Sequence, residues 1–252
     1  QYQHFMFILP SNIPCNWAGV GNVGCENHCN TWIRALPKSD YSHRIYAHEF
    51  GHNLGMMHSA TDFNNNGSDI NAYGDKACFM GISEDLKELN APHRDLLHWF
   101  DNYPQSIRTI EKSGTYTLQS LESGITDSTS LVFKIKRNEQ ETYYLSYRKN
   151  IGDFGSGTPE YINKVSIHKT KQGSINTYLV KILDIGEQFL DKESNISIEL
   201  LDSRGEFAHI YVNINRPKID LCEYSSRNRD LTCHAQQGGL LNLGHKEEIY
   251  RK

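Results

Sequence analysis

The stretch from His48 to His58 reads His-Glu-Phe-Gly-His-Asn-Leu-Gly-Met-Met-His. On an α-helix, His48 and His52 lie on one face, about one turn or ~6 Å apart. That separation lets two imidazole nitrogens bind one zinc ion at ~2.0–2.1 Å. Glu49 points to the neighbouring side of the metal, where its carboxylate can take a proton from a zinc-bound water. The stretch therefore predicts a helix that carries a metal site.

The end of the same stretch predicts a third ligand. Gly55 stands where the helix should end, and glycine tolerates the positive φ with which a chain leaves a helix axis sharply. Three residues later, His58 can return to the metal. Three protein ligands leave one position for water, which is typical of a catalytic zinc site and not of a structural one.

The ordinary alternative to a metal site is a polar helix face in solvent. A short His-Glu-x-x-His string arises by chance, but the longer string also fixes a glycine and a third histidine. The residues within and around it are largely apolar, including Tyr46, Ala47, Phe50, Leu54 and Met56. This composition favours a helix buried under a cleft.

The composition of the whole chain argues against several classes of function. The chain has 252 residues, 38% hydrophobic and 22% charged, with a formal net charge of -4, which fits one large domain or two modest ones. Lysine and arginine are scattered without a dense basic block, which argues against nucleic acid as the main partner. No apolar run is long enough to span a membrane or to act as a signal core. We therefore expect a secreted protein whose signal and pro-segment are absent from this chain.

The cysteines indicate an oxidising compartment. Cys25 and Cys29 resemble half of a zinc site, but no second pair of matching spacing follows, so disulfides are the favoured role. Cys222 and Cys233 would close a short C-terminal loop. The sequence does not choose among the pairings that these four and the remaining Cys15 and Cys78 allow. Disulfides are typical of exported proteins.

The composition changes near residue 105. Most histidines and all three tryptophans precede it, and short runs of β-branched and aromatic residues at period two follow it. These runs are Thr115–Leu118, Leu131–Ile135, Thr142–Tyr147, Val165–Ile167, Tyr178–Ile182, Ile196–Leu200 and His209–Ile214. Their spacing predicts a β-sandwich. The chain is thus divided into a metal-binding domain (1–105), an all-β sandwich domain (106–216) and a polar, irregular tail with two cysteines (217–252).

The first domain is predicted to contain both strands and helices, so the fold class is α+β. The apolar run His4–Pro10 predicts a buried strand, and Thr31–Leu36 predicts another. The Gly-rich stretch from Gly19 to Gly24 could be an edge strand. Helices are expected at Arg44–Leu54 and at Pro92–Phe100, where the proline suits a first helical position.

Further strings around the long motif resemble a known family. Tyr73-Gly74-Asp75 with Cys78-Phe79-Met80-Gly81 resembles the Met-turn of the metzincin peptidases, with Met80 beneath the zinc. The strings Cys15–Gly19, Thr31–Ile33 and Asn90–His93 are similar to the gametolysin family of metzincins. The resemblance covers about residues 5–100 well, and in the β-rich half it is weaker.

The resemblance implies a zinc-dependent endopeptidase of extracellular or cell-wall proteins. His48, His52 and His58 would bind the zinc, and Glu49 would be the general base that activates the attacking water. The residues Gly19, Val20, Gly21, Asn22 and Val23 would form the upper rim of the cleft, where an extended substrate adds as a strand.

Two departures from the metzincin pattern matter. Only 47 residues precede the first zinc histidine, fewer than metzincin catalytic domains usually carry, so the domain is expected to be a fragment or a processed form. No tyrosine stands two residues after Met80, so a tyrosine zinc ligand is not supported.

A second metal site is suggested by the loop after the third histidine. It begins Asp-x-Asn-x-Asn-Gly, which resembles a calcium loop with ligands from Asp62, Asn64 and Asn66. Tyr73 stands where an EF-hand has its last, bidentate glutamate. We therefore favour a polar, turn-rich loop and keep calcium as the alternative.

Two other functions compete with peptide hydrolysis. The chain could be a catalytically inactive module in which the β-sandwich binds a surface ligand. The intact Glu49 counts against this alternative, because an inactive enzyme has no chemical need for that carboxylate, whereas a shortened N-terminal sheet counts for it. Hydrolysis of a non-peptide amide is the third possibility, and no feature of the sequence demands it.

Overall fold

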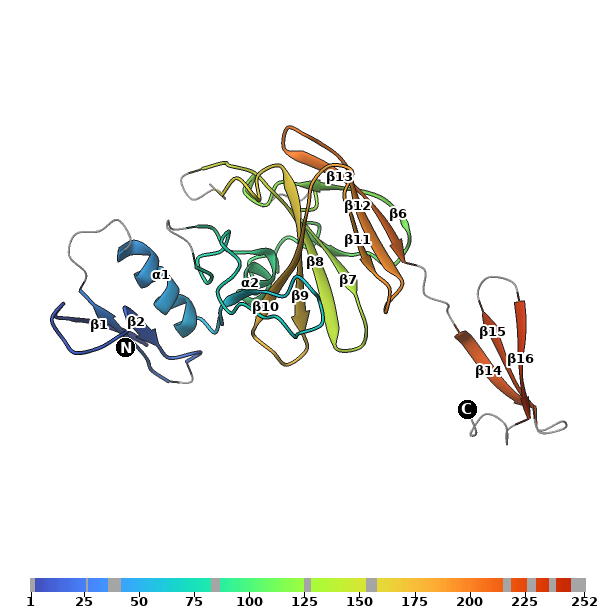
Figure 1. The fold of residues 1–252 in the computed structure, drawn as a ribbon, viewed down its shortest axis with the longest axis horizontal. Coiled ribbons are helices and arrows are strands. Elements are labelled where there is room, and N and C mark those ends of the chain that lie inside the picture. The colour runs from blue at the N-terminus through green and yellow to red at the C-terminus, as the bar shows by residue number, and fades with distance from the viewer. Residues whose placement is uncertain are drawn as a thin grey trace.

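The structure is a computed structural model that describes residues 3–25, 27–35, 42–82, 87–124, 128–152, 158–214, 219–225, 230–235 and 239–245. Within these ranges the chain is mostly β-structure, arranged in four sheets with two helices (Figure 1). No helix in the described part of the chain is both long and apolar enough to cross a lipid bilayer.

The N-terminal sheet consists of β1 (His4–Leu9), β2 (Gly19–Gly21) and β3 (Cys29–Arg34) in the order β1-β3-β2. β1 runs parallel to β3, and β2 runs antiparallel to it as an edge strand. Alternate residues of β3 are buried, and one of them, Thr31, donates a hydrogen bond to Asn53 at the end of helix α1 (Ser42–Asn53), 3.0 Å away. The sheet thus positions the helix of the long motif.

The prediction that the first strand is buried is wrong. Four consecutive residues of β1, Phe5, Met6, Phe7 and Ile8, are 39–52% exposed. An apolar run of this kind predicts a strand correctly, but burial depends on a layer that packs over it. In the described part of the chain, α1 packs on the sheet mainly through β2 and β3, and it contacts β1 at His4 through the ring of Phe50.

Two larger sheets share one core. The six-stranded sheet has the order β4-β10-β9-β8-β7-β5, and the four-stranded sheet has the order β11-β12-β13-β6. Their strands are β4 (Ser59–Thr61), β5 (Ile107–Thr109), β6 (Gly114–Gln119), β7 (Val132–Lys136), β8 (Glu141–Arg148), β9 (Lys164–Lys171), β10 (Thr177–Leu183), β11 (Gln188–Asp191), β12 (Ile196–Arg204) and β13 (Phe207–Ile214). Buried apolar side chains from both sheets form one cluster, which includes Leu145 and Ile167 of one sheet and Ile198 and Val212 of the other.

The six-stranded sheet also receives a strand from the histidine-rich part of the chain. β4 follows His58 directly and pairs in parallel with β10, with Ser59 opposite Thr177. A run of three small residues carries no strand signal of its own, so the sequence did not predict it. As a result, the segment that follows the third histidine is anchored to the β-rich half.

Helix α2 (Ala91–Leu96) packs on the face of the six-stranded sheet that points away from the shared core. The helix is shorter than predicted. Asn90 caps its N-terminus by accepting a hydrogen bond from the backbone N–H of His93 at 3.0 Å. His98 has a φ of 61°, which a continuing helix cannot contain, so the predicted extension to Phe100 is wrong. Phe100 is nevertheless buried, in a cluster with Ala91.

The C-terminal part contains a sheet of its own. β14 (Ile219–Ser225), β15 (Asp230–Ala235) and β16 (Gly239–His245) form an antiparallel meander. The prediction of an irregular tail is therefore wrong over these described residues. Cys222 lies directly opposite Cys233 in the register of β14 and β15, which agrees with the predicted proximity of the two residues.

Candidate metal centre

The three histidines of the long motif come together. His48 and His52 lie on α1, and their ring centroids are 4.9 Å apart. The ring of His58 lies 5.3 Å from the first and 5.0 Å from the second. Each residue offers a ligand atom, and these atoms all lie within 4.8 Å of one another. Such a group can close around one ion.

The chain reverses at the end of α1 to bring His58 back. Gly55 has a φ of 91°, a conformation that side chains other than glycine rarely adopt. The backbone N–H of Met56 donates to the carbonyl of Gly51 at 3.1 Å, which closes the last turn and directs the chain away from the helix axis. The predicted role of the glycine thus has a local geometric basis.

Two backbone carbonyls orient the helical histidines. Nδ1 of His48 donates to the carbonyl of Phe79 at 2.9 Å, and Nδ1 of His52 donates to the carbonyl of Met56 at 2.8 Å. These bonds fix the tautomer, so that Nε2 of each ring keeps its lone pair for a metal. A histidine set oriented in this way fits zinc, which binds neutral imidazoles with a second shell of carbonyl acceptors.

The histidines are also neutral at physiological pH. Burial lowers the pKa of His48 to about 4, against the opposing hydrogen bond to Phe79 and with a smaller contribution from the neighbouring histidines. Burial likewise lowers the pKa of His58 to about 4 and lowers that of His52. Because a metal binds the deprotonated imidazole, no proton has to be displaced near neutral pH.

Glu49 is buried beside the histidines under strand β2. Burial raises the pKa of its carboxyl group to about 7, although a hydrogen bond with the backbone of Gly21 acts in the opposite direction. A β-carbon added to Gly19 would lie 2.6 Å from Cγ of Glu49, and one added to Gly21 would lie 2.5 Å from the Glu49 carbonyl oxygen. Only glycine therefore lets β2 lie this close to the helix.

The predicted cleft rim combines this strand with the turn that follows it. Val20, between the two glycines, is 42% exposed, and Val23 is 45% exposed. The backbone of Asn22 donates to the carbonyl of Asn30 and accepts from the side chain of Asn53. The rim is thus bound to both the sheet and the helix.

A cavity of about 300 Å³ lies beside the histidines. Its walls come from the rim, the helix and the segment after the third histidine, and they consist of Trp17, Ala18, Gly19, Arg44, Ile45, His48, Glu49, Tyr73, Gly81 and Ile82. The cavity therefore contains both the first histidine and the predicted general base.

Tyr73 is a site residue that the motif search did not assign. Its ring centroid lies 3.9 Å from that of His58 and 6.0 Å from that of His48. Burial and then the negative charge of Glu49 raise the pKa of its phenol, so the hydroxyl stays protonated near neutral pH. No motif spacing identifies a tyrosine located seven residues before Met80 as part of the site.

Met80 lies directly beneath α1. A β-carbon added to Gly51 would be 2.5 Å from the sulfur of Met80, so this helix position requires glycine for the methionine to pack there. Met80 is fully buried in a cluster with Met56, Cys78 and Leu89. Met80 therefore packs against α1 at Gly51, which stands between His48 and His52 in the sequence.

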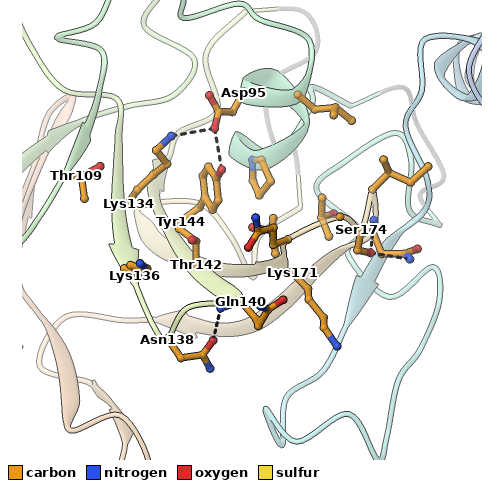
Figure 2. Close-up of a pocket in the computed structure, with 18 of the residues that line it drawn as sticks. Asp95, Thr109, Lys134, Lys136, Asn138, Gln140, Thr142, Tyr144, Lys171 and Ser174 are labelled. Atoms are coloured by element: carbon orange, nitrogen blue, oxygen red, sulfur yellow. Dashed lines mark hydrogen bonds and ion pairs between the residues drawn. The ribbon is translucent and has the colours of Figure 1, made fainter.

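A second and larger cavity, about 660 Å³, lies between α2 and the strands β7 to β9 (Figure 2). On its floor, Asp95 accepts hydrogen bonds from Lys134 at 3.2 Å and from the hydroxyl of Tyr144 at 2.7 Å. None of the residues predicted for the metal site lines this cavity.

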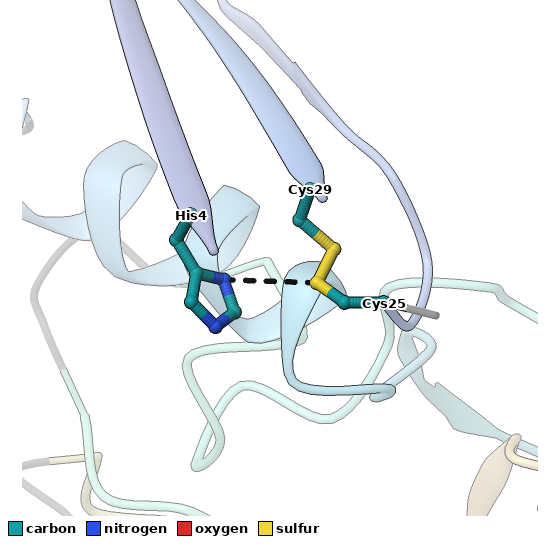
Figure 3. A group of neighbouring side chains, drawn as sticks. All are labelled: His4, Cys25 and Cys29. Atoms are coloured by element: carbon teal, nitrogen blue, oxygen red, sulfur yellow. Dashed lines mark hydrogen bonds between the residues drawn. A yellow bond between two sulfur atoms is a disulfide. The ribbon is translucent and has the colours of Figure 1, made fainter. Parts of the chain in front are cut away.

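Cys25 and Cys29 form a disulfide at the start of β3 (Figure 3). Nδ1 of His4 lies 3.7 Å from the sulfur of Cys25. The disulfide supports the predicted role over the half-zinc-site interpretation, because bonded sulfurs are not thiolate ligands. Cys15 and Cys78 are free thiols in the described part of the chain.

In the calcium-like loop, a lysine occupies the place of a cation. Nζ of Lys169, on β9, donates to a carboxylate oxygen of Asp62 at 3.1 Å and to the side-chain oxygen of Asn65 at 2.8 Å. The side chain of Asn66 instead accepts from the backbone and hydroxyl of Ser68. The predicted ligands therefore do not converge on one empty point.

Comparison with known proteins agrees with the motif. The sequence profile described as Gametolysin peptidase M11 matches residues 1–189. The chain belongs to this family. The family is described as a peptidase family, and the three converging histidines of this gametolysin-family chain lie within the matched residues.

One curated relative of this gametolysin-family chain is an autolysin from Chlamydomonas reinhardtii, with 22% identity over 273 residues. The match covers 90% of the chain and 42% of the relative, so the chain spans less than half of the relative's length. No solved structure matches the chain significantly.

Proposed function

We propose that this member of the gametolysin family is a zinc-dependent endopeptidase with His48, His52 and His58 as the metal ligands. The observation that carries the proposal is the convergence of three imidazoles, one of which lines the same cavity as the buried carboxylate of Glu49. Backbone carbonyls orient two of the three rings, those of His48 and His52. When bound, the zinc supplies a Lewis acid that lowers the pKa of a bound water towards ~7 and polarises the scissile carbonyl.

Glu49 is the general base in this proposal. Its raised pKa of about 7 suits a group that accepts a proton from water and then delivers it to the leaving amine. In this proposal the rim from Gly19 to Val23 binds the substrate as an added strand, because β2 is an edge strand and its first residue, Gly19, lines the cavity. The buried Met80 supports α1 from below.

The proposed organisation follows the composition of the chain. A metzincin-type catalytic domain (1–105) precedes a β-sandwich domain (106–216), whose two sheets enclose the common core and which receives β4 from the first domain. Residues 217–252 form a cysteine-containing C-terminal part. The name of the related autolysin and the resemblance stated above favour a secreted enzyme that cleaves extracellular or cell-wall proteins.

The alternative of an inactive surface-binding module is disfavoured by the buried Glu49. An isolated carboxylate under a strand is costly to maintain unless it is used. As for calcium, we propose that the ammonium of Lys169 serves as the internal cation of the loop that begins at Asp62.

A direct test compares the wild type with Glu49→Ala on a mixed peptide library, each with and without a zinc chelator. We expect cleavage by the untreated wild type alone, while Glu49→Ala still binds zinc. A wild type that binds zinc but cuts no peptide would support the binding-module alternative. Cleavage by Glu49→Ala at the wild-type rate would overturn the assigned base.

A further inference from the structure

A buried carboxylate lies between the metal site and the six-stranded sheet. Asp75 and its partner His168, on β9, are each 1% exposed, and Nε2 of the histidine lies 3.0 Å from the carboxylate. The same oxygen accepts hydrogen bonds from the hydroxyl of Ser59 at 2.6 Å and from the amide of Asn90 at 3.2 Å. Burial alone would raise the pKa of Asp75, but these hydrogen bonds and the nearby positive charges lower it, so the group is ionised.

The two residues after Asp75 are also held by the β-rich half. The hydroxyl of Tyr161 accepts a hydrogen bond from the backbone N–H of Lys76 at 3.1 Å. Arg148, on β8, donates to the carbonyl of Ala77 at 3.1 Å, and its guanidinium forms an ion pair with Glu122. Three consecutive loop residues are therefore each bound by a different side chain from the second half of the chain.

This loop leads directly to a group that orients the metal site. The backbone N–H of Gly81 donates to the carbonyl of Cys78 at 2.9 Å, and a β-carbon on Gly81 would lie only 2.0 Å from the carbonyl oxygen of Asp75. The turn from Asp75 to Gly81 is therefore tight. At its tip, the carbonyl of Phe79 accepts the Nδ1 hydrogen bond of His48. A shift of Asp75 is transmitted to Phe79 because four residues of a compact turn cannot absorb it.

We infer that His168, Tyr161 and Arg148 act as a clamp that positions the 75–81 turn and, through Phe79, the imidazole of His48. His168 is a positioning residue that contacts neither substrate nor metal. The inference rests on the proposed function in that it takes the three histidines as the metal ligands. It assigns the β-rich half a part in the metal centre, in addition to any part in substrate binding.

The competing explanation is that His168 only stabilises the fold. Ile167, the next residue on β9, provides the matched control because it is fully buried in the core on the opposite face of the sheet. If His168 has a purely structural role, changes at His168 and at Ile167 should both lower the thermal stability, and neither should change the zinc affinity. If His168 is part of the clamp, changes at His168 should lower the zinc affinity, whereas changes at Ile167 should not.

The test measures zinc dissociation constants by competition with a chromophoric chelator, together with apo-protein melting temperatures, for the wild type, His168→Leu, His168→Gln and Ile167→Ala. We expect His168→Leu to bind zinc at least ~10-fold more weakly, as found when groups behind metal ligands are removed. His168→Gln, which retains an N–H donor for Asp75, should recover most of the affinity. Ile167→Ala should lose thermal stability and keep its affinity.

Tyr161→Phe removes one hydroxyl and is not expected to prevent folding, so it provides a second variant if His168→Leu does not fold. It should weaken zinc binding several-fold and, in the peptidase assay, lower kcat with little change in KM. Wild-type zinc affinity in both His168→Leu and Tyr161→Phe would overturn the clamp. A wild type that binds zinc without cutting peptides would instead refute the proposed activity and leave the affinity comparison decisive for the clamp.

Discussion

Replacing Gly21 by alanine should separate substrate alignment from metal binding. The added β-carbon would lie 2.5 Å from the carbonyl oxygen of Glu49 and 3.3 Å from Cβ of His52, whereas ordinary contacts begin at 3.4 Å. The helix backbone cannot yield without breaking its own hydrogen bonds, so β2 has to retreat by 0.9 Å, the difference between 3.4 and 2.5 Å. Overpacking of this kind costs about 1–3 kcal/mol of stability.

The effect on catalysis should exceed the effect on stability. A misplacement of about 1 Å in a group that aligns the substrate can lower the rate by ~100-fold. The proposed zinc ligands lie on α1 and after it, and not on β2, so zinc binding should remain near the wild-type level. We expect Gly21→Ala to lose about two orders of magnitude in kcat/KM on a peptide selected from the library.

Val20→Ala is the matched control, because this neighbouring side chain is 42% exposed and its truncation creates no overlap. Its kcat should stay within a few-fold of the wild-type value. Its KM can rise, because the shorter side chain loses contact with the substrate. Metal content by mass spectrometry and melting temperature complete the comparison. Wild-type kcat/KM in Gly21→Ala would refute the close packing of β2 on the helix as the reason for glycine.

Three further predictions concern charge and pH. Because burial lowers the pKa of His48 and His58 to about 4 and also lowers that of His52, protons should begin to compete with zinc at a lower pH than the ordinary histidine value of 6.5 predicts, as a chelator titration across pH would show. The pKa of Asp75 is lowered by folding, so its stabilising effect is full above its unfolded value of ~3.9 and is lost as the pH falls below it. Asp75→Asn should therefore lose about 3 kcal/mol of unfolding free energy near neutral pH and less in acid, as measured by urea denaturation at both pH values. Lys169→Met should be destabilised by about 3 kcal/mol, and millimolar calcium should raise the melting temperature of this variant but not that of the wild type.

The helical part of the metal site could be predicted from the sequence because its geometry is local. The spacing of His48 and His52 follows from the helix period, and the position of His58 follows from a positive φ at Gly55. The glycines of the rim predicted their part of the site less directly than the histidines did. Their spacing indicated an edge strand, but the reason for them, contact with the backbone of the helix, depends on tertiary packing.

The groups that orient the site could not be predicted, because their partners are distant in the sequence. The carbonyl of Phe79 binds a histidine 31 residues earlier, and His168 binds Asp75 from 93 residues away. Every residue has a backbone carbonyl, so no sequence motif can identify the contact between Phe79 and His48. The second involves one histidine at period two in a strand, a pattern that is also typical of a solvent-facing position.

Lys169 shows how a polar residue in an apolar pattern can indicate a partner. Val165 and Ile167 are buried in the core between the two sheets, and period two places Lys169 on the same face. A lysine in such a position requires an acceptor, and the loop that begins at Asp62 supplies it. The Asp-x-Asn-x-Asn-Gly pattern was visible in the sequence, whereas the strand predicted at Val165–Ile167 ended before Lys169. Only the pairing of β4 with β10 shows that the loop and Lys169 meet, which changes the interpretation of the loop.

The composition boundary near residue 105 therefore does not separate the functional parts. By sequence, β4 and the 75–81 turn belong to the histidine-rich half, yet β4 pairs with β10 and the turn is bound by side chains of β8 and β9. The helix that carries His48 and His52 contacts the N-terminal sheet, whereas the carbonyl that orients His48 is held by the β-rich half. The proposed metal site thus lies where the two halves meet, and in the clamp proposal its geometry depends on how they pack. A division of the chain by composition describes its folding patterns, but the chemistry belongs to the interface between them.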